Sequence, residues 1–218
     1  MASFSSTSPA SPSTSVTTPF VIGGAAADVI TVSLYNENTC SSQIGTGTRS
    51  TFIGSGIQVS VTPNNTTPIY GTTTDAASNT SACTLLTNYI HDNTGPSDPS
   101  FSSTSPASPS SSDTAPEVIG SSSGDTTTVS LYSDSVCTTS IGSGTKATFE
   151  GAGITATVTA NTATTIYGRA SDTYGNTSAC TLLTSYTHDN TAPTAPSFTS
   201  TTPSLSLIHI SEPTRPID

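Results

Sequence analysis

The sequence lacks tryptophan and is poor in charge, and positive charge is the scarcer sign. Only four of its 218 residues are Lys or Arg, against 14 Asp or Glu, so the formal net charge is −10 at pH 7. Such a chain would repel phosphates, and we therefore exclude nucleic-acid binding. With no tryptophan and seven tyrosines, little aromatic surface is left for stacking on sugars. The sequence also has no apolar run long enough to span a bilayer.

The dominant feature of the sequence is an internal repeat. Residues 79–94, NTSACTLLTNYIHDNT, return almost unchanged as residues 176–191, which is 97 positions later (176 minus 79). The segment SFSSTSPASPS at Ser3 likewise returns at Ser100. A period of this length corresponds to a whole domain rather than a solenoid turn. We therefore predict two domains, residues 1–96 and 97–193, followed by the start of a third at residues 194–203.

Alternation of apolar residues predicts β-strands within each period. The clearest strand is Val29–Tyr35, with Val32 and Leu34 pointing inward. The other predicted strands are Ser3–Ser8, a segment starting at residues 21–23, a glycine-rich strand at residues 44–52, and residues 57–62, 68–74 and 82–91; in the last, Cys83, Leu85 and Tyr89 are expected on one face. The low charge alone would permit disorder, but this repeated alternation opposes it. No segment shows helical periodicity, which indicates an all-β sandwich.

Each period contains two cysteines at matching positions. They are Cys40 and Cys83, repeated as Cys137 and Cys180. An even number that recurs with the domain predicts one disulfide per domain and an oxidising compartment. Zinc is the alternative, but two cysteines and one histidine at wide spacing make a poor zinc site. Free thiols would leave a small, weakly charged domain with little to hold it together.

The second period resembles the bacterial immunoglobulin-like repeats of large surface and secreted proteins. The segments that carry the resemblance are TVSLYSDSVC, IGSGTKATF, TTIYGRASDTYGNTSAC and HDNTAPTAPSFTSTTP. The family has a turn before its last strand, matched by Asp172, Gly175, Asn176 and Ser178, and a junction to the next domain, matched by Asp189, Thr191, Ala192 and Pro193. The first period departs from these patterns at Ser78 and Gly95. The resemblance implies tandem immunoglobulin-like β-sandwiches of about seven strands each, outside the cell or on a bacterial surface.

The same resemblance suggests how the cysteines pair. In a sandwich of this type the loop with Cys40 and the loop before the last strand lie at one end, so we predict the bonds Cys40–Cys83 and Cys137–Cys180. It also suggests a calcium site, because related adhesin stalks are stiffened by Ca²⁺. Hard oxygen ligands from Asp92 in the junction, and from Asp172 and Asn176 in the facing loop, could share one ion. Ordinary turn formation by Asp and Asn is the alternative, and no other cofactor is expected.

The repeated histidines do not indicate an enzyme. His91 and His188 each precede an aspartate, yet no nucleophile elbow or oxyanion-forming glycine motif accompanies them. We therefore predict that both are surface residues at the junctions, and no catalytic residue is proposed.

Spacer repeats forming the stalk of an adhesin are the expected function. Their partners would be neighbouring repeats of the same chain. The alternative is a repeated, low-affinity module that binds a host or matrix glycan or protein and gains avidity from repetition.

The two ends of the chain are interpreted separately. Residues 205–216, LSLIHISEPTRP, have no counterpart earlier and resemble a translated sequencing-library adapter. We therefore interpret residues 204–218 as a non-native tail, with a genuine tail as the alternative. Met1 lies directly on the repeat register, which is expected of a fragment from a longer array. The missing signal peptide is then no argument for the cytoplasm.

Overall fold

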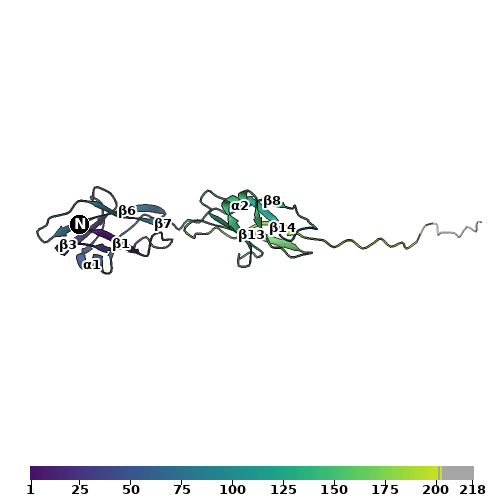
Figure 1. The fold of residues 1–218 in the computed structure, drawn as a ribbon, viewed down its shortest axis with the longest axis horizontal. Helices are drawn as coiled ribbons and strands as arrows, with labels where there is room; N and C mark the ends of the chain where they lie inside the picture. The colour runs from purple at the N-terminus through teal and green to yellow at the C-terminus, as the bar shows by residue number, and fades with distance from the viewer. Residues whose placement is uncertain (201, 203–218) are drawn as a thin grey trace, which may run out of the picture.

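A computed structural model describes residues 1–200 and residue 202, which include both complete repeats. The repeats form two β-sandwiches that lie end to end (Figure 1). The first contains β1 (Ser3–Ser8), β2 (Phe20–Gly24), β3 (Val29–Tyr35), β4 (Gln43–Thr48), α1 (Arg49–Ile53), β5 (Ile57–Gln58), β6 (Asn65–Asp75) and β7 (Thr84–His91). The second contains β8 (Ser100–Ser105), β9 (Glu117–Ser121), β10 (Thr128–Tyr132), β11 (Ser140–Thr145), α2 (Lys146–Glu150), β12 (Ile154–Thr155), β13 (Ala163–Ser171) and β14 (Thr181–Thr187).

Each sandwich consists of a three-stranded and a four-stranded antiparallel sheet. The strand orders are β1-β2-β5 and β4-β3-β6-β7 in the first repeat, and β8-β9-β12 and β11-β10-β13-β14 in the second. The segment after the first strand then crosses to the other sheet, where Ser13 pairs with His91 and Ser110 pairs with His188. The predicted fold class is confirmed: the chain consists of tandem immunoglobulin-like β-sandwiches of seven strands each.

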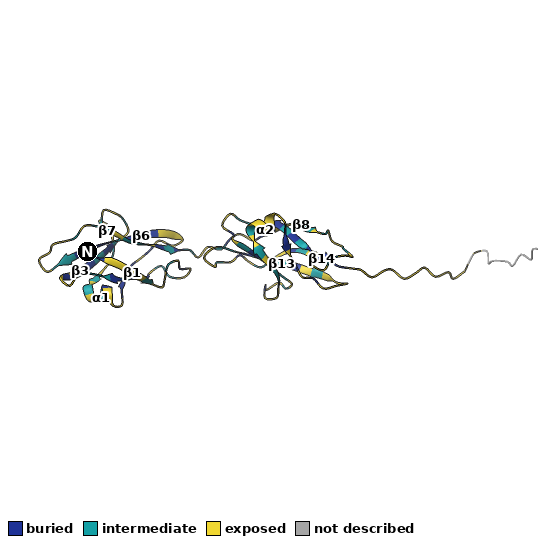
Figure 2. Ribbon diagram, viewed as in Figure 1, coloured by how far each residue is buried: buried dark blue, intermediate teal, exposed yellow. Residues whose placement is uncertain are grey.

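The core of each repeat lies between its two sheets (Figure 2). Val32 and Leu34 of β3 are fully buried, as predicted. Ile30 has the same two-residue spacing but is 52% exposed, because the strand register shifts between Val29 and Thr31. The predicted alternation of residues 57–62 is also present, with Ile57, Val59 and Val61 buried. This pattern follows from the two-residue period of a strand, which sends successive side chains to opposite faces of a sheet.

The prediction of one strand over residues 44–52 is wrong. β4 ends at Thr48, whose hydroxyl accepts a hydrogen bond from the Thr51 N–H at 3.2 Å and caps the short helix α1. The helical turn places Phe52 in the core, where it is fully buried. The second repeat builds the same turn from Thr145 to Phe149. One turn is too short to produce a helical period in the sequence, so pattern analysis missed it.

The expected inward face of the last strand is also wrong at Leu85. This side chain is 52% exposed, and Leu86 packs against the core instead. Tyr70 pairs with Leu85, whereas Ile69 pairs with Thr87, so Leu86 is the extra residue of a β-bulge. A bulge shifts the alternation by one residue, which reverses the face of every residue on one side of it.

Residues 192–200 follow the second sandwich and form no strand. Phe198 lies within the expected start of a third repeat, 97 positions after Phe101, and is 74% exposed. In β1 and β8, Phe4 pairs with Gly23 of β2 and Phe101 pairs with Gly120 of β9, and the sequence after residue 203 has no counterpart of β2 or β9. The predicted tail, residues 204–218, lies outside the described residues. In the part of the chain that the structure describes, no helix is long and apolar enough to cross a membrane.

Candidate functional site

The candidate site is the joint between the repeats, and it begins where β7 ends. The Nδ1 atom of His91 accepts a hydrogen bond from the Asn64 N–H at 3.1 Å. The side-chain oxygen of Asn64 in turn accepts the Asn93 N–H at 2.8 Å, and Asp92 Oδ1 accepts the Thr94 N–H at 3.0 Å. Residues of the first repeat alone therefore fix the direction in which the chain leaves it. The second repeat makes the same three bonds at 3.1, 2.9 and 2.9 Å.

The prediction that His91 and His188 lie on the surface is wrong. They are only 2% and 3% exposed. The segment that follows β1 covers His91. Its residue Ser13 pairs with His91, and the backbone oxygen of Ser13 accepts the Asp92 N–H at 3.0 Å. Sequence analysis placed the histidines by their neighbouring aspartates. Their position two residues after the buried Tyr89 or Tyr186, on the same face of the strand, was the signal that it overlooked.

The second repeat receives the chain with the turn between β13 and β14. Asp172 Oδ1 accepts hydrogen bonds from the backbone N–H groups of Tyr174 and Asn176 at 2.8 and 2.9 Å. Asp172 Oδ2 accepts a third bond, from Asn176 Nδ2, at 2.8 Å. Burial raises the pKa of the Asp172 carboxyl, but these bonds outweigh burial and the net pKa lies below its usual value. The turn is therefore held closed by an ionised carboxylate.

The corresponding turn of the first repeat forms without glycine. Gly175 has a φ of 88°, and Ser78 occupies the same left-handed region with a φ of 66°. Asp75 makes the same bonds to Ala77 and Asn79, each at 2.9 Å. The Asn79 side chain is the main reason that the pKa of Asp75 is lowered. The carboxylate and amide thus define the turn, and the glycine is dispensable.

One hydrogen bond joins the repeats directly. Asn176 Nδ2 donates to the backbone oxygen of Asp92 at 3.0 Å, in addition to its bond to Asp172. Gly95 then passes so close to Thr177 that a Cβ atom at this position would lie 2.5 Å from the Thr177 backbone oxygen. Real side chains do not tolerate such an approach, so the glycine permits this contact. Pro96, which follows, is buried.

Two further bonds hold the connecting segment against the second repeat. The Ser97 N–H donates to Ser123 Oγ at 3.2 Å. Asp98 Oδ1 accepts the Ala179 N–H at 3.0 Å. The connection is therefore bound along its length rather than tethered only at its ends.

The structure brings together the three residues predicted to bind calcium, but through other atoms. Asn176 presents an N–H donor to Asp92, and Asp92 contributes its backbone carbonyl rather than its carboxylate. The Asp92 and Asp172 carboxylates each bond to N–H groups of their own turn. Among residues 1–200 and 202 there is no group of three His, Cys, Asp or Glu residues that could hold a metal ion.

Both predicted disulfides are present in the structure. The Cα–Cα distance is 5.9 Å for Cys40–Cys83 and 5.8 Å for Cys137–Cys180. They lie beside the middle of the four-stranded sheet rather than at its end. In the first repeat, Tyr35 at the end of β3 pairs with Tyr70 of β6, and Thr84 at the start of β7 pairs with the next residue, Gly71. Each bond therefore ties the last strand to the loop between the third and fourth strands.

An acidic residue that sequence analysis missed organises each disulfide loop. Glu37 accepts hydrogen bonds from the backbone N–H groups of Thr39, Ser41 and Ser42 at 3.0, 2.5 and 2.8 Å. The Thr39 hydroxyl and these backbone donors lower the pKa of Glu37 from 4.5 to about 2. Asp134, three residues before Cys137, has its pKa lowered from 3.8 to about 2, mainly by the Thr139 N–H. The sequence did contain a signal for this role, because an acidic residue stands three positions before Cys40 and before Cys137.

We expect the carboxylates of Glu37 and Asp134 to make the free energy of unfolding depend on pH in the acidic range. Because the folded pKa of Glu37 lies below its usual value, its stabilising contribution is complete above about pH 4.5 and is lost as the pH falls towards about 2. The urea midpoint should therefore fall over this range. In the double variant Glu37→Gln and Asp134→Asn, the urea midpoint should depend less steeply on pH. Part of the dependence should remain, because Asp75 and Asp172 are still present. A double variant with an unchanged slope would contradict this role.

Comparison with known proteins reveals similarity only at the level of shape. Neither a family model nor a curated protein matches the sequence. The fibronectin(III)-like modules of CbhA from Clostridium thermocellum are 10% identical, with a TM-score of 0.48, and the match covers 91% of this chain and 100% of that one. The D00-D0 domain of intimin is 13% identical, with a TM-score of 0.34, and the match covers 84% of this chain and 100% of that one. The fold assignment rests on the strand order described above.

Proposed function

We propose that the repeats are structural spacers of an extracellular bacterial surface protein and form part of an adhesin stalk. The observation that carries this proposal is the joint, in which Asn176 bonds to Asp92 and Gly95 packs on Thr177. One disulfide in each repeat supports an oxidising, extracellular location. The principal partners are then neighbouring repeats of the same kind, and no catalytic step is assigned.

A spacer must resist swinging at each connection. An unbound linker would allow the repeats to reorient, whereas here residues 92–98 are fixed at both ends. The buried Pro96 adds stiffness because its ring fixes φ. This combination transmits direction from one repeat to the next, so the separation of the ends grows with the number of repeats.

Calcium is a separate proposal for the same joint. A cation shared by Asp92, Asp172 and Asn176 would stiffen the connection further. The hydrogen bonds described above hold the segment without one, and proline supplies stiffness of its own. We favour the hydrogen bonds and proline, and the scattering experiment below includes calcium and chelator samples to separate the two accounts.

The spacer proposal predicts a stiff two-repeat chain that Asn176→Ala loosens. Small-angle scattering should show one extended shape for the native protein and a broader range of end-to-end distances for the variant, because the direct bond between the repeats is lost. Asn79→Ala, the equivalent change in the first repeat, is the matched control and should leave the shape unaltered. Calcium and then chelator should change neither the maximum dimension nor the thermal stability. A native chain as flexible as Asn176→Ala would refute the spacer proposal.

Repeated binding of a glycan or protein is the second candidate function. The observation in its favour is a hollow of about 320 Å³ between the first and last strands, beside Phe4, Ser11, Thr87 and Asn88. Phe4 is 38% exposed and offers one aromatic face amid hydroxyl and amide groups. One aromatic ring gives weak stacking, so such binding would depend on avidity from many repeats.

A further inference from the structure

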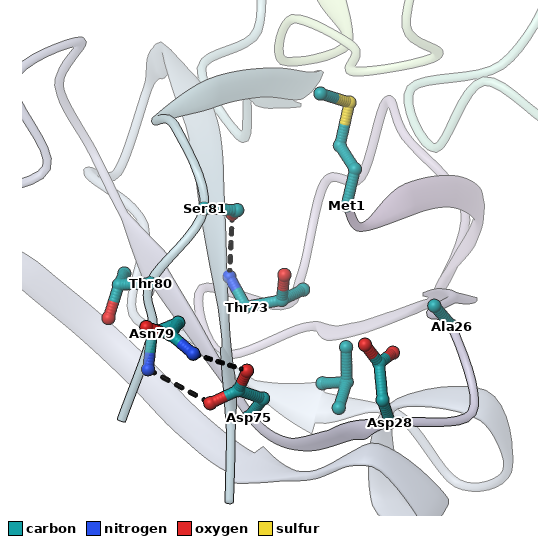
Figure 3. Close-up of a pocket in the computed structure, with 9 residues that line it drawn as sticks. Met1, Ala26, Asp28, Thr73, Asp75, Asn79, Thr80 and Ser81 are labelled. Atoms are coloured by element: carbon teal, nitrogen blue, oxygen red, sulfur yellow. Dashed lines mark hydrogen bonds between the residues drawn. The ribbon is translucent and has the colours of Figure 1, made fainter. Parts of the chain in front are cut away.

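The first repeat has a hollow at the end that faces away from the second repeat. Its volume is about 260 Å³, and its lining includes Ala26, Asp28, Asp75, Asn79 and Thr80. In the close-up, Asp75 and Asn79 lie on one side, Ala26 and Asp28 lie across from them, and Met1 lies at the rim (Figure 3). This volume is below the roughly 300–1,000 Å³ typical of small-molecule sites.

This hollow occupies the same place in the first repeat as the receiving end of the joint in the second. Asp75, Asn79 and Thr80 correspond to Asp172, Asn176 and Thr177 at the repeat offset. In the second repeat, Asn176 holds the backbone oxygen of Asp92, and Thr177 packs against Gly95. The residues that make the joint are thus present, unchanged in type, at the end of the first repeat that faces away from the second.

The two ends differ in how far these residues are covered. Asn79 is exposed, whereas Asn176 is half-buried under the connecting segment. The amide of asparagine carries two N–H donors. Asn79 Nδ2 donates to Asp75 at 2.9 Å, and the matching bond in the second repeat coexists with the one to Asp92. Asn79 therefore has the same second donor to offer to a peptide carbonyl.

We propose that this hollow is a docking site for the junction segment of a second copy of the repeat. The segment binds as in the joint, with the carbonyl of its first aspartate on the Asn79 amide and its glycine against Thr80. The proposal rests on the proposed spacer function, because it extends the observed joint to another repeat. One contact is weaker than in the joint, since Ala26 stands where Ser123 accepts the Ser97 N–H.

The glycine gives the site a selectivity that can be tested. A Cβ atom at Gly95 would lie 2.5 Å from the Thr177 backbone oxygen, and we expect the same crowding against Thr80. A segment with alanine at this position, as in the second period at Ala192, must shift before it fits. Overpacking of this kind is expected to weaken binding by about fivefold or more.

The experiment titrates the full chain, labelled with ¹⁵N, with a peptide of residues 91–97, HDNTGPS. A tethered segment acts at an effective concentration on the order of millimolar, so the free peptide is taken to about ten times that. We expect NMR shift changes at the Asn79 side-chain amide and at the backbone of Thr80 and Ser81. Asn176 and Thr177 should not respond, because the chain's own segment already occupies them, and they serve as an internal control.

Two matched controls complete the test. The same peptide with alanine in place of glycine should bind at least about fivefold more weakly. Asn79→Ala should abolish the response, and its thermal melting would establish that the repeat remains folded. An unresponsive Asn79, or equal responses to both peptides, would overturn the docking proposal. The spacer function is tested separately by scattering, so it could stand while this proposal fails.

Discussion

Removing the Cys40–Cys83 bond is expected to lower the melting temperature of the first repeat by roughly 15 °C or more. The bond closes a loop with a sequence separation of 43. On the chain-entropy relation, a loop of this size stabilises the folded state by about 4 kcal/mol. That is a large share of a typical domain stability of about 5–15 kcal/mol. The bond also anchors β7, the last strand in the order of its sheet.

The double variant Cys40→Ala and Cys83→Ala tests this expectation by calorimetry. Its first repeat should melt well before the second, which splits the transition in two. Replacing Cys137 and Cys180 instead should reverse which repeat melts first, as shown by NMR signals from each. Peptide mapping without reduction should find the two bonds within repeats. A crosslink between Cys40 and Cys137, or four free thiols, would show the pairing to be wrong.

The sequence predicts the strands well where one face of the strand is buried and the other is exposed to solvent. Val32 and Leu34 alternate with polar or exposed neighbours, and comparison of the two periods marks them as inward. Prediction fails where a single residue changes the geometry. Thr48 starts a helical turn by capping it, and the bulge at Leu86 depends on pairing with β6. A helix cap or a β-bulge involves one or two residues and therefore produces no periodic pattern in the sequence.

The sequence points to the residues of the joint but not to the hydrogen bonds that they make. Asp92, Asp172 and Asn176 were expected to meet, and they do, because the repeats lie end to end. The bond between the repeats uses an amide N–H and a backbone carbonyl, and the shared calcium ion stays a prediction. Backbone atoms are the same in every residue, so a sequence pattern cannot reveal that one carbonyl is the partner. Gly95 departs from the resemblance in sequence, but its close approach to Thr177 depends on how the two repeats pack and leaves no sequence pattern.

The repeated bonds at each exit explain how identical domains can form a directed array. The Asn64 N–H donates to His91, and the Asn64 side chain accepts the Asn93 N–H. These two hydrogen bonds connect the core of the repeat to the segment that leaves it. Asn64 has a φ of 51°, a left-handed conformation that asparagine tolerates better than most residues. The His91 contact offsets the cost of that conformation. The direction of exit is therefore coupled to the packing of a buried side chain.

His91→Ala is the second variant with a large expected effect. The imidazole is 2% exposed, so its removal leaves a cavity and deprives the Asn64 N–H of its partner. We expect a loss of about 3 kcal/mol in the free energy of unfolding, measured with urea. His91→Leu fills most of the space without restoring the acceptor, and should recover only part of that loss.

The same change should also loosen the joint, and this effect separates a positioning role from mere stability. Without His91, Asn64 no longer holds Asn93 in place, and the first repeat no longer fixes the direction of exit. Small-angle scattering under conditions where both repeats remain folded should show a broader range of end-to-end distances. His188→Ala is the matched control, because it removes the equivalent contact with Asn161 downstream of the joint. It should destabilise the second repeat similarly while leaving the two repeats aligned. Equal loosening by both variants would mean that general destabilisation, rather than the exit bonds, determines the stiffness.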